Sequence, residues 1–249
     1  MTAIALDERF PARPRADRNA FLVAVALIWV GVLSGFGTDS FDHVSKHGLD
    51  YPLIVHFHAV AFVGWLALFT LQVALVRSDR LSEHKRLGIY GMVLAAIMVV
   101  LGPATAVIVD AQKYATTGRT PEFMAVQFAD ILAFATLTGA GLWMRARDSS
   151  AHKRLMLLGL IYISDAGFAR FLNRFIAPTG PGFLPSLVHL YVATWILVLG
   201  FGAYDYIARR RLHPAYIAGA IWILALQLSA VTLLNTPAWK ALTMRMIGH

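Results

Sequence analysis

The sequence predicts an all-α fold, a polytopic membrane bundle of seven transmembrane helices. Three observations lead to this prediction: 58% of the 249 residues are hydrophobic, only 14% are charged, and the mean hydropathy is +0.62. A soluble domain of this length has roughly 45–50% apolar and about 25% charged residues, and a disordered chain is less apolar still. We therefore expect most of the chain to lie in a lipid bilayer.

Seven stretches are apolar over the roughly 20 residues that a helix needs to cross the hydrocarbon core. They are 20–38, 51–76, 87–109, 123–144, 155–176, a span within 175–204 that begins near Leu184, and a span within 212–239. The fourth span contains Asp130. The fifth is the weakest prediction because it holds Asp165, Arg170 and Arg174. The predicted organisation is an N-terminal segment (1–19), a transmembrane domain (20–235) and a tail (236–249).

Lys and Arg alternate between the two sides of this arrangement. The chain carries 22 Lys and Arg against 14 Asp and Glu, a net charge of +8. The segments before the first span and after the second, fourth and sixth spans hold 15 of these cations, and the other four segments hold 7. Because cytoplasmic segments are rich in Lys and Arg, we expect a cytoplasmic N-terminus and an outer C-terminus in a bacterial inner (plasma) membrane. The positive charge then reflects topology, and nucleic acid is not an expected partner.

Several chemistries are excluded by what the sequence lacks. It contains no cysteine, which excludes disulfides, thiolate metal sites, iron–sulfur clusters and cysteine nucleophiles. No span contains a lysine, so a retinal Schiff base is not expected. The phosphate-binding GxxxxGK[ST], zinc-protease HExxH and esterase GxSxG motifs are absent. No nucleophile–base pair is visible, and the sequence leaves open whether the protein is an enzyme.

A short basic motif recurs at the cytoplasmic ends of the predicted spans. His84-Lys-Arg-Leu is repeated 68 residues later as His152-Lys-Arg-Leu, and a fainter copy surrounds His213. Each histidine is followed six or seven residues later by a glycine, and these are Gly91, Gly159 and Gly219. Spans two and three, four and five, and six and seven are therefore predicted to form related helical hairpins, an arrangement that often frames a site between repeats.

The histidines of this motif have two interpretations. At a helix start, an imidazole can accept hydrogen bonds from free backbone N–H groups while the adjoining Lys and Arg meet lipid phosphates. Alternatively, His84 and His152 line a shared cytoplasmic-side site for a cofactor or an anionic headgroup. The sequence leaves both interpretations open.

Three further histidines lie within the bilayer near its predicted outer surface. His56 and His58 begin the second span and His189 begins the sixth, about 6–9 Å below the outer boundary at the rise of an α-helix. His56 and His58 point roughly 200° apart, so only one can face a given partner. Imidazoles at matched depth on two helices can ligate a haem iron from both faces. The alternatives are a hydrogen bond to a neighbouring helix and a proton relay.

Charged residues inside a span are costly and usually face the bundle interior with a partner. Asp130 and Arg170 lie at similar distances from the outer ends of adjacent spans, which predicts an ion pair between them. Asp165 lies deeper and is the best candidate for carrying a proton, because a lone buried carboxyl group tends to stay protonated. Arg170 and Arg174 can also clamp an anion such as a haem propionate.

Over about residues 50–235 the sequence resembles a family of bacterial multi-spanning membrane proteins of unknown function. A weaker resemblance is to transmembrane dihaem b-type cytochromes. The latter implies an outer haem between His56 or His58 and His189, and an inner haem between His84 and His152, although the inner pair departs from the cytochrome pattern by lying at helix starts. The motifs behind the first resemblance are His56-x-His58, Trp65, Gln72, His84-Lys-Arg-Leu-Gly, Asp130, His152-Lys-Arg-Leu-Met, Asp205 and His213-Pro.

The sequence thus predicts an integral membrane protein that binds b-type haem and transfers electrons within the membrane, with quinone as a partner. Two alternatives need no cofactor. One is a proton-coupled small-solute transporter or lipid-binding protein, which rests on Asp130, Asp165 and Arg170. The other is an accessory subunit of a larger membrane complex. A homo-oligomer is also compatible with the sequence.

Overall fold

The computed structural model describes residues 10, 15–172, 175 and 182–249. Within these residues all regular structure is helical, which confirms the all-α prediction. In chain order the helices are α2 (Arg15–Val32), the π-helix η1 (Leu33–Gly37), α3 (Thr38–His47), α4 (Leu53–Arg77), α5 (Leu81–Thr117), α6 (Met124–Met144), α7 (Ser149–Ile163), α8 (Asp165–Leu172), α9 (Phe183–Arg209), α10 (Pro214–Leu234) and α11 (Pro237–Met246).

Six stretches of helix are long and apolar enough to cross a membrane: α2 continued through α3, then α4, α5, α6, α9 and α10. The helices α7 and α8 are together long and apolar enough for a seventh span, but they are bent by 42° where Ser164 separates them. Counting this broken pair as one span gives the seven predicted helices. The break falls in the fifth predicted span, the one richest in charge, and Asp165 is the first residue of α8.

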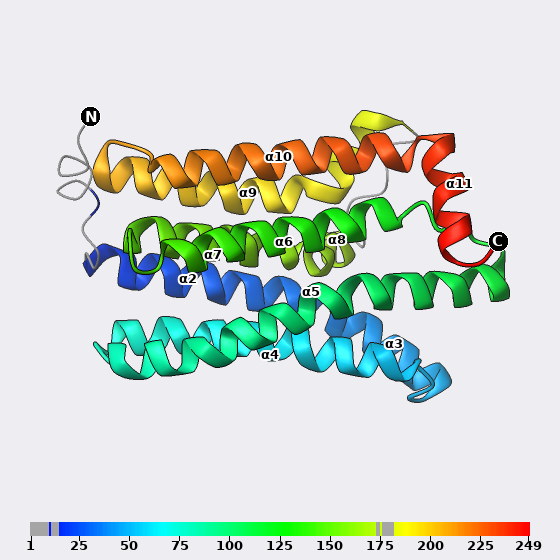
Figure 1. Cartoon of the computed structure of the whole chain (residues 1–249), viewed down its shortest axis with the longest axis horizontal. Coiled ribbons are helices and arrows are strands. Elements are labelled where there is room, and N and C mark those ends of the chain that lie inside the picture. Colours follow the sequence, from blue (N-terminus) through cyan, green and yellow to red (C-terminus); the bar gives the residue numbers. More distant parts are fainter. Residues whose placement is uncertain (1–9, 11–14, 173–174, 176–181) are drawn as a thin grey trace.

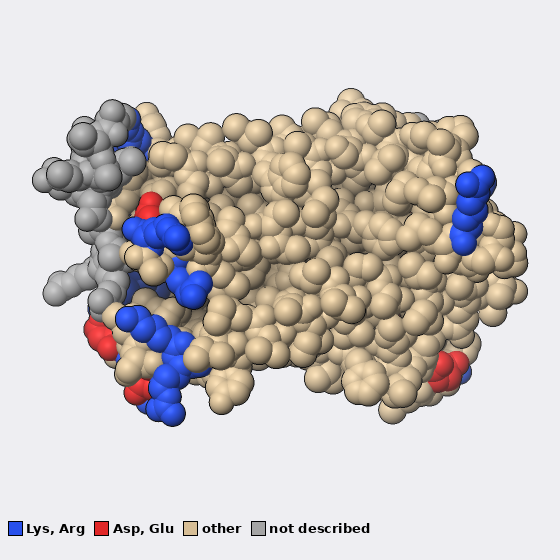
Figure 2. All heavy atoms as spheres, in the orientation of Figure 1, with Lys and Arg blue, Asp and Glu red and all other residues tan. Residues whose placement is uncertain are grey.

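The two ends of the bundle differ in charge. We call the end at which α2, α5, α7 and α10 begin the inner end, after the predicted topology, and the opposite end the outer end (Figure 1). Figure 2 shows Lys and Arg gathered mainly at the inner end of the visible face, next to a broad belt of uncharged side chains. Large apolar side chains such as Val60 and Val100 are each 73% exposed, as expected for helices that face lipid.

The span formed by α7 is the most deeply buried. Ten of its 15 residues are buried, because α6 and α10 both pack along it and α9 contacts it from another side. α6 also contacts α5, so α6 and α7 lie in the middle of the bundle, with the α4–α5 and α9–α10 hairpins on opposite sides (Figure 1). Polar groups on α7 therefore need partners inside the protein.

The hairpins α4–α5, α6–α7 and α9–α10 turn at the inner end, as predicted. Two glycines that follow the motif histidines lie at close helix crossings. A Cβ atom on Gly159 would lie 3.0 Å from Thr138 Oγ1, and one on Gly219 would lie 2.6 Å from a methyl group of Leu158. Small residues at such crossings allow transmembrane helices to approach closely.

A second close contact joins the first span to the broken one. Gly35 in η1 packs against Gly167 in α8, and a Cβ atom on Gly35 would lie only 2.7 Å from the carbonyl carbon of Gly167. π-helical turns are rare in proteins, and those that occur are often found at functional sites. This contact positions the start of α8, and hence Asp165, relative to the first span.

The predicted C-terminal tail forms α11, which lies across the outer end of the bundle (Figure 1). Trp239 Nε1 donates a hydrogen bond to the carbonyl oxygen of Glu122 at 2.9 Å. Lys240 Nζ lies 3.2 Å from Glu122 Oε1. These contacts tie α11 to the loop before α6.

Candidate functional site

Two carboxyl groups lie between the middle of the bundle and its outer end. Asp165 is 3% exposed, and its Oδ1 accepts a hydrogen bond of 2.8 Å from Thr194 Oγ1 on α9. Asp130 on α6 is half-buried, and its Oδ1 is shielded from solvent without a hydrogen-bond partner. The two carboxyl groups interact electrostatically. Neither has Lys or Arg within ion-pairing distance among the described residues.

Two tyrosines accompany these carboxyl groups. Tyr162 on α7 and Tyr191 on α9 are both fully buried, and their rings stack with centroids 6.2 Å apart. The two hydroxyls interact with each other, and neither has a further hydrogen-bond partner within the part of the chain that the structure describes. The charges of Asp130 and Asp165 act on both hydroxyls. We call Asp130, Asp165, Tyr162, Tyr191 and Thr194 the carboxyl cluster.

Arg170 lies at the outer rim of this cluster and does not form the predicted ion pair with Asp130. Its Nε lies 3.1 Å from Asp39 Oδ2 in α3, and its guanidinium group lies over the ring of Phe36 at 4.4 Å. The reason is that η1 and α3 continue the first span and carry Asp39 next to α8. Arg174, the second predicted anion clamp, lies outside the described residues.

The outer histidines make separate contacts, each close to its own helix. His56 Nδ1 lies 3.4 Å from the carbonyl oxygen of Pro52 on its own helix. The His58 ring stacks on Phe62 with centroids 4.0 Å apart, and its buried Nδ1 has no partner. His189 is half-buried on α9, and no ring contact joins it to His56 or His58 among the described residues.

The structure does bring the two inner histidines together. The His84 and His152 rings have centroids 6.5 Å apart and an interplanar angle of 78°. His152 Nδ1 lies 2.8 Å from the carbonyl oxygen of Gly141 on α6, and the ring of His84 interacts with the backbone of Gln72 on α4. Neither histidine caps its helix: α5 has no side-chain cap, and Asp148 caps α7. We call these two residues the inner histidine pair.

The cations that follow His152 belong to an ion network that the sequence did not predict. Arg154 and Asp205 are both fully buried and form two hydrogen bonds of 2.6 Å. Lys153 and Arg209 both bind Asp17 on α2. These cations were expected at the lipid surface, and they are buried because α7 is central. The sequence does contain one sign of this network. Asp17 and Asp205 are single acidic residues near the inner ends of apolar spans, where they can pair with the cations.

His213, in the third copy of the motif, caps a helix, which was one of the two interpretations of the motif histidines. It precedes α10, and its Nδ1 accepts a hydrogen bond of 3.1 Å from the backbone N–H of Ala215. Its Nε2 lies 3.4 Å from Asp148 Oδ2. Burial, and then the cation of Arg154, lower the pKa of His213 to about 4. The cap is therefore neutral at neutral pH.

This depressed pKa predicts a pH dependence of stability. Between its ordinary pKa of about 6.5 and the folded value of about 4, the unfolded chain binds a proton at His213 that the folded chain does not. Stability at this site therefore falls as the pH falls through that range. We expect His213→Asn, which can still cap α10, to show a smaller loss of Tm from pH 7 to pH 5 in detergent. Equal losses in both proteins would contradict this prediction.

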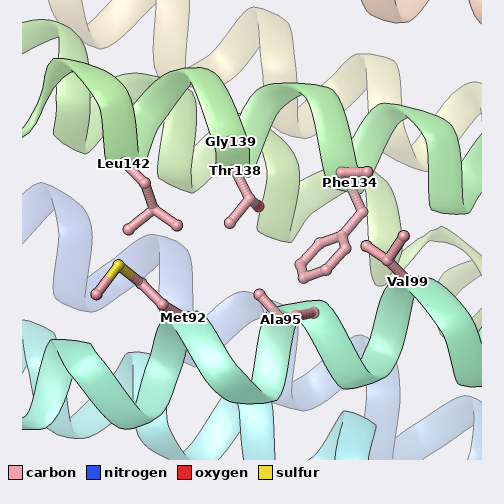
Figure 3. Close-up of a pocket in the computed structure, with 9 residues that line it drawn as sticks. Met92, Ala95, Val99, Phe134, Thr138, Gly139 and Leu142 are labelled. Atoms are coloured by element: carbon pink, nitrogen blue, oxygen red, sulfur yellow. The ribbon is translucent and has the colours of Figure 1, made fainter.

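A groove of about 200 Å³ lies between α5 and α6 (Figure 3). Its lining is apolar apart from Thr138, and it comprises Met92, Ala95, Ala96, Val99, Phe134, Ala135, Thr138, Gly139 and Leu142. Its wall near Leu142 adjoins Gly141, which binds His152. Among the described residues, no group of three or more His, Asp or Glu side chains can hold a metal ion.

These features define a multi-pass helical membrane protein with a carboxyl cluster at the break between α7 and α8 and a histidine pair at the inner end. Comparison with protein-family models, with curated proteins and with solved structures gives no match. A proposal for the function therefore rests on the chemistry of the residues.

Proposed function

We propose that the chain is a proton-coupled membrane protein of the bacterial inner membrane, in which the carboxyl cluster binds and passes protons during the movement of a small solute. The observation that supports this proposal is Asp165, which is 3% exposed at the break of a span and has only a neutral hydroxyl as its partner. Placing an ionisable residue inside a membrane costs free energy, so such residues usually have a function.

The broken span supports this assignment. Transporters commonly bind substrates and coupling ions where a transmembrane helix is interrupted, because the interruption frees polar backbone groups near the membrane centre. Here the interruption at Ser164 lies directly before Asp165. The buried hydroxyls of Tyr162 and Tyr191, which interact with each other, offer further donors and acceptors for a proton or a polar solute.

The charged groups at the rim would provide a route by which protons reach the carboxyl cluster from the outer end. Arg170 pairs with Asp39 at the exposed rim and acts electrostatically on both His58 and Asp130. His58 has a buried unpaired nitrogen. Protons would thus pass from the rim through His58 and Asp130 to Asp165.

The test uses the full chain in liposomes that contain a pH-sensitive dye, with a membrane potential set by potassium and valinomycin. We expect proton flux with the unmodified protein and with Asp165→Glu, which keeps the carboxyl group. Asp165→Asn should lower the flux by about tenfold or more, as expected for loss of a positioned proton carrier.

Asp110 provides the matched control. It is also a buried carboxyl group, 6% exposed on α5, but it has Lys113 3.6 Å away. Asp110→Asn should therefore leave the flux unchanged. Absence of flux in the unmodified protein, or equal flux with Asp165→Asn, would contradict the proposal.

A further inference from the structure

The groove between α5 and α6 opens onto the lipid-facing surface of the bundle (Figure 3). Ala96 and Gly139, which line it, are exposed. Val93 and Val100 on the adjoining side of α5 are exposed as well, at 57% and 73%. Because the helices at this level cross the hydrocarbon core of the bilayer, the molecule that fills the groove comes from the membrane.

The size of the groove suits part of one lipid tail. On α5 it extends from Met92 to Val99, which is about 10 Å along the helix axis. Its volume is about 200 Å³, and an apolar cavity of about 150 Å³ holds a benzene molecule. The groove is therefore too small for a lipid headgroup or a macrocycle, but it accommodates a stretch of a single acyl chain.

Two exposed cations, Lys85 and Arg145, flank the inner end of the groove. Lys85 precedes Met92 by two helical turns, so the two residues share one side of α5, about 20° apart around the axis. Arg145 follows Leu142 by almost one turn, directly after the last residue of α6. The inner end of the groove is therefore positively charged.

The inner histidine pair keeps these two cations near each other. Lys85 acts electrostatically on His84, and Arg145 acts on His152. The two histidine rings are in edge-to-face contact, with centroids 6.5 Å apart. This contact joins the first turn of α5 to the first turn of α7, so that a cation from each hairpin lies beside it.

Neither cation forms an ion pair with an acidic residue among those that the structure describes. The acidic side chains close to them in the sequence have other partners: Glu83 pairs with Arg80 at 3.1 Å, and Asp148 lies 3.4 Å from His213. Lys and Arg at the cytoplasmic surface of a membrane attract anionic lipids. The two cations therefore remain available for a lipid phosphate.

The second copy of the motif provides a contrast. Lys153, which stands there in the position of Lys85, binds Asp17 within the protein, whereas Lys85 is exposed at the groove. Trp143, close to Arg145, is 61% exposed, and exposed Trp side chains gather at the level of the lipid headgroups. Arg145 thus lies at the depth at which a phosphate is expected.

We propose that the protein binds one anionic phospholipid of the leaflet at its inner end, with the lipid phosphate between Lys85 and Arg145 and one acyl chain in the groove between α5 and α6. The two cations give charge-assisted hydrogen bonds to the phosphate, and the apolar walls of the groove contact the chain. This site is independent of the carboxyl cluster, because no member of that cluster lines the groove.

The test titrates the purified full chain in detergent with phosphatidylglycerol, and separately with phosphatidylcholine of the same chain length, and counts bound lipids by native mass spectrometry. We expect one phosphatidylglycerol to bind more tightly than phosphatidylcholine. Lys85→Gln and Arg145→Gln should each weaken its binding by about fivefold, the usual contribution of one cation at a membrane surface. Arg86→Gln is the matched control, because Arg86 is also exposed but lies about 100° further around α5, and it should leave binding unchanged.

A second pair of variants tests the groove. A Cβ atom on Gly139 or on Gly200 would meet nothing within 4 Å, but only Gly139 lines the groove. Gly139→Leu should therefore weaken phosphatidylglycerol binding severalfold, and Gly200→Leu should not. Equal affinity for the two lipids, or equal losses with Lys85→Gln and Arg86→Gln, would overturn the proposal in favour of diffuse surface charge. Unchanged binding in Gly139→Leu would overturn the placement of the acyl chain in the groove.

Discussion

Replacing Arg154 by alanine should destabilise the protein by about 3–5 kcal/mol, the usual cost of breaking a buried ion pair from one side. Arg154 and Asp205 are both 0% exposed and share two hydrogen bonds of 2.6 Å. Removing the guanidinium group leaves Asp205 with Arg209 as its remaining cation, 2.8 Å away. The measurement is the free energy of unfolding of the purified protein in mixed micelles.

Two comparisons separate the buried pair from a general loss of charge. Arg80 pairs with Glu83 at 3.1 Å, but both side chains are largely exposed, so Arg80→Ala should cost less than about 1 kcal/mol. The double variant Arg154→Met with Asp205→Leu should recover part of the loss, since no unpaired charge remains buried. Equal effects of Arg154→Ala and Arg80→Ala would contradict the assignment of Arg154 to the core.

The two copies of the His-Lys-Arg-Leu motif show what the sequence could not predict. In the first copy Lys85 and Arg86 are exposed, whereas in the second Lys153 binds Asp17 and Arg154 is fully buried. The residues are identical, but α7 is surrounded by other spans and α5 is not. A single sequence indicates which helices exist, and burial of a given face depends on how the helices are packed.

The spans themselves follow from hydropathy, because a bilayer imposes a fixed length on any helix that crosses it. The concentration of charge in residues 155–176 also marked the place where the span is broken at Ser164. The partner of Arg170 did not follow, since it depends on η1 and α3 extending the first span to Asp39. Depth along a helix could be counted from the sequence, but rotation about its axis could not. For that reason His189 was paired with His56 or His58 on depth alone.

The inner histidine pair and the carboxyl cluster lie at opposite ends of α7. His152 lies in the first turn of α7, and Asp165 follows its end 13 residues later, about 20 Å away at the rise of an α-helix. The most buried span of the bundle therefore joins the inner histidine pair to the carboxyl cluster.

The second large effect concerns the glycine contact that positions α8. We expect Gly35→Ala to destabilise the protein by about 3 kcal/mol, the upper end of the usual range for overpacking. The new methyl group would overlap the Gly167 carbonyl group, with its carbon only 2.7 Å away, and a backbone cannot rotate aside as a side chain can. The helix α8 would have to move away from η1.

Gly37 is the matched control because it lies in the same π-helix and a Cβ atom there would meet nothing within 4 Å. Gly37→Ala should leave both the free energy of unfolding and the proton flux unchanged. Gly35→Ala should lower both, since a shift of α8 carries Asp165 away from Thr194, its hydrogen-bond donor on α9. A Gly35→Ala protein with normal stability would show that η1 and α8 do not pack this closely. Lowered stability with normal flux would separate the glycine contact from the carboxyl cluster.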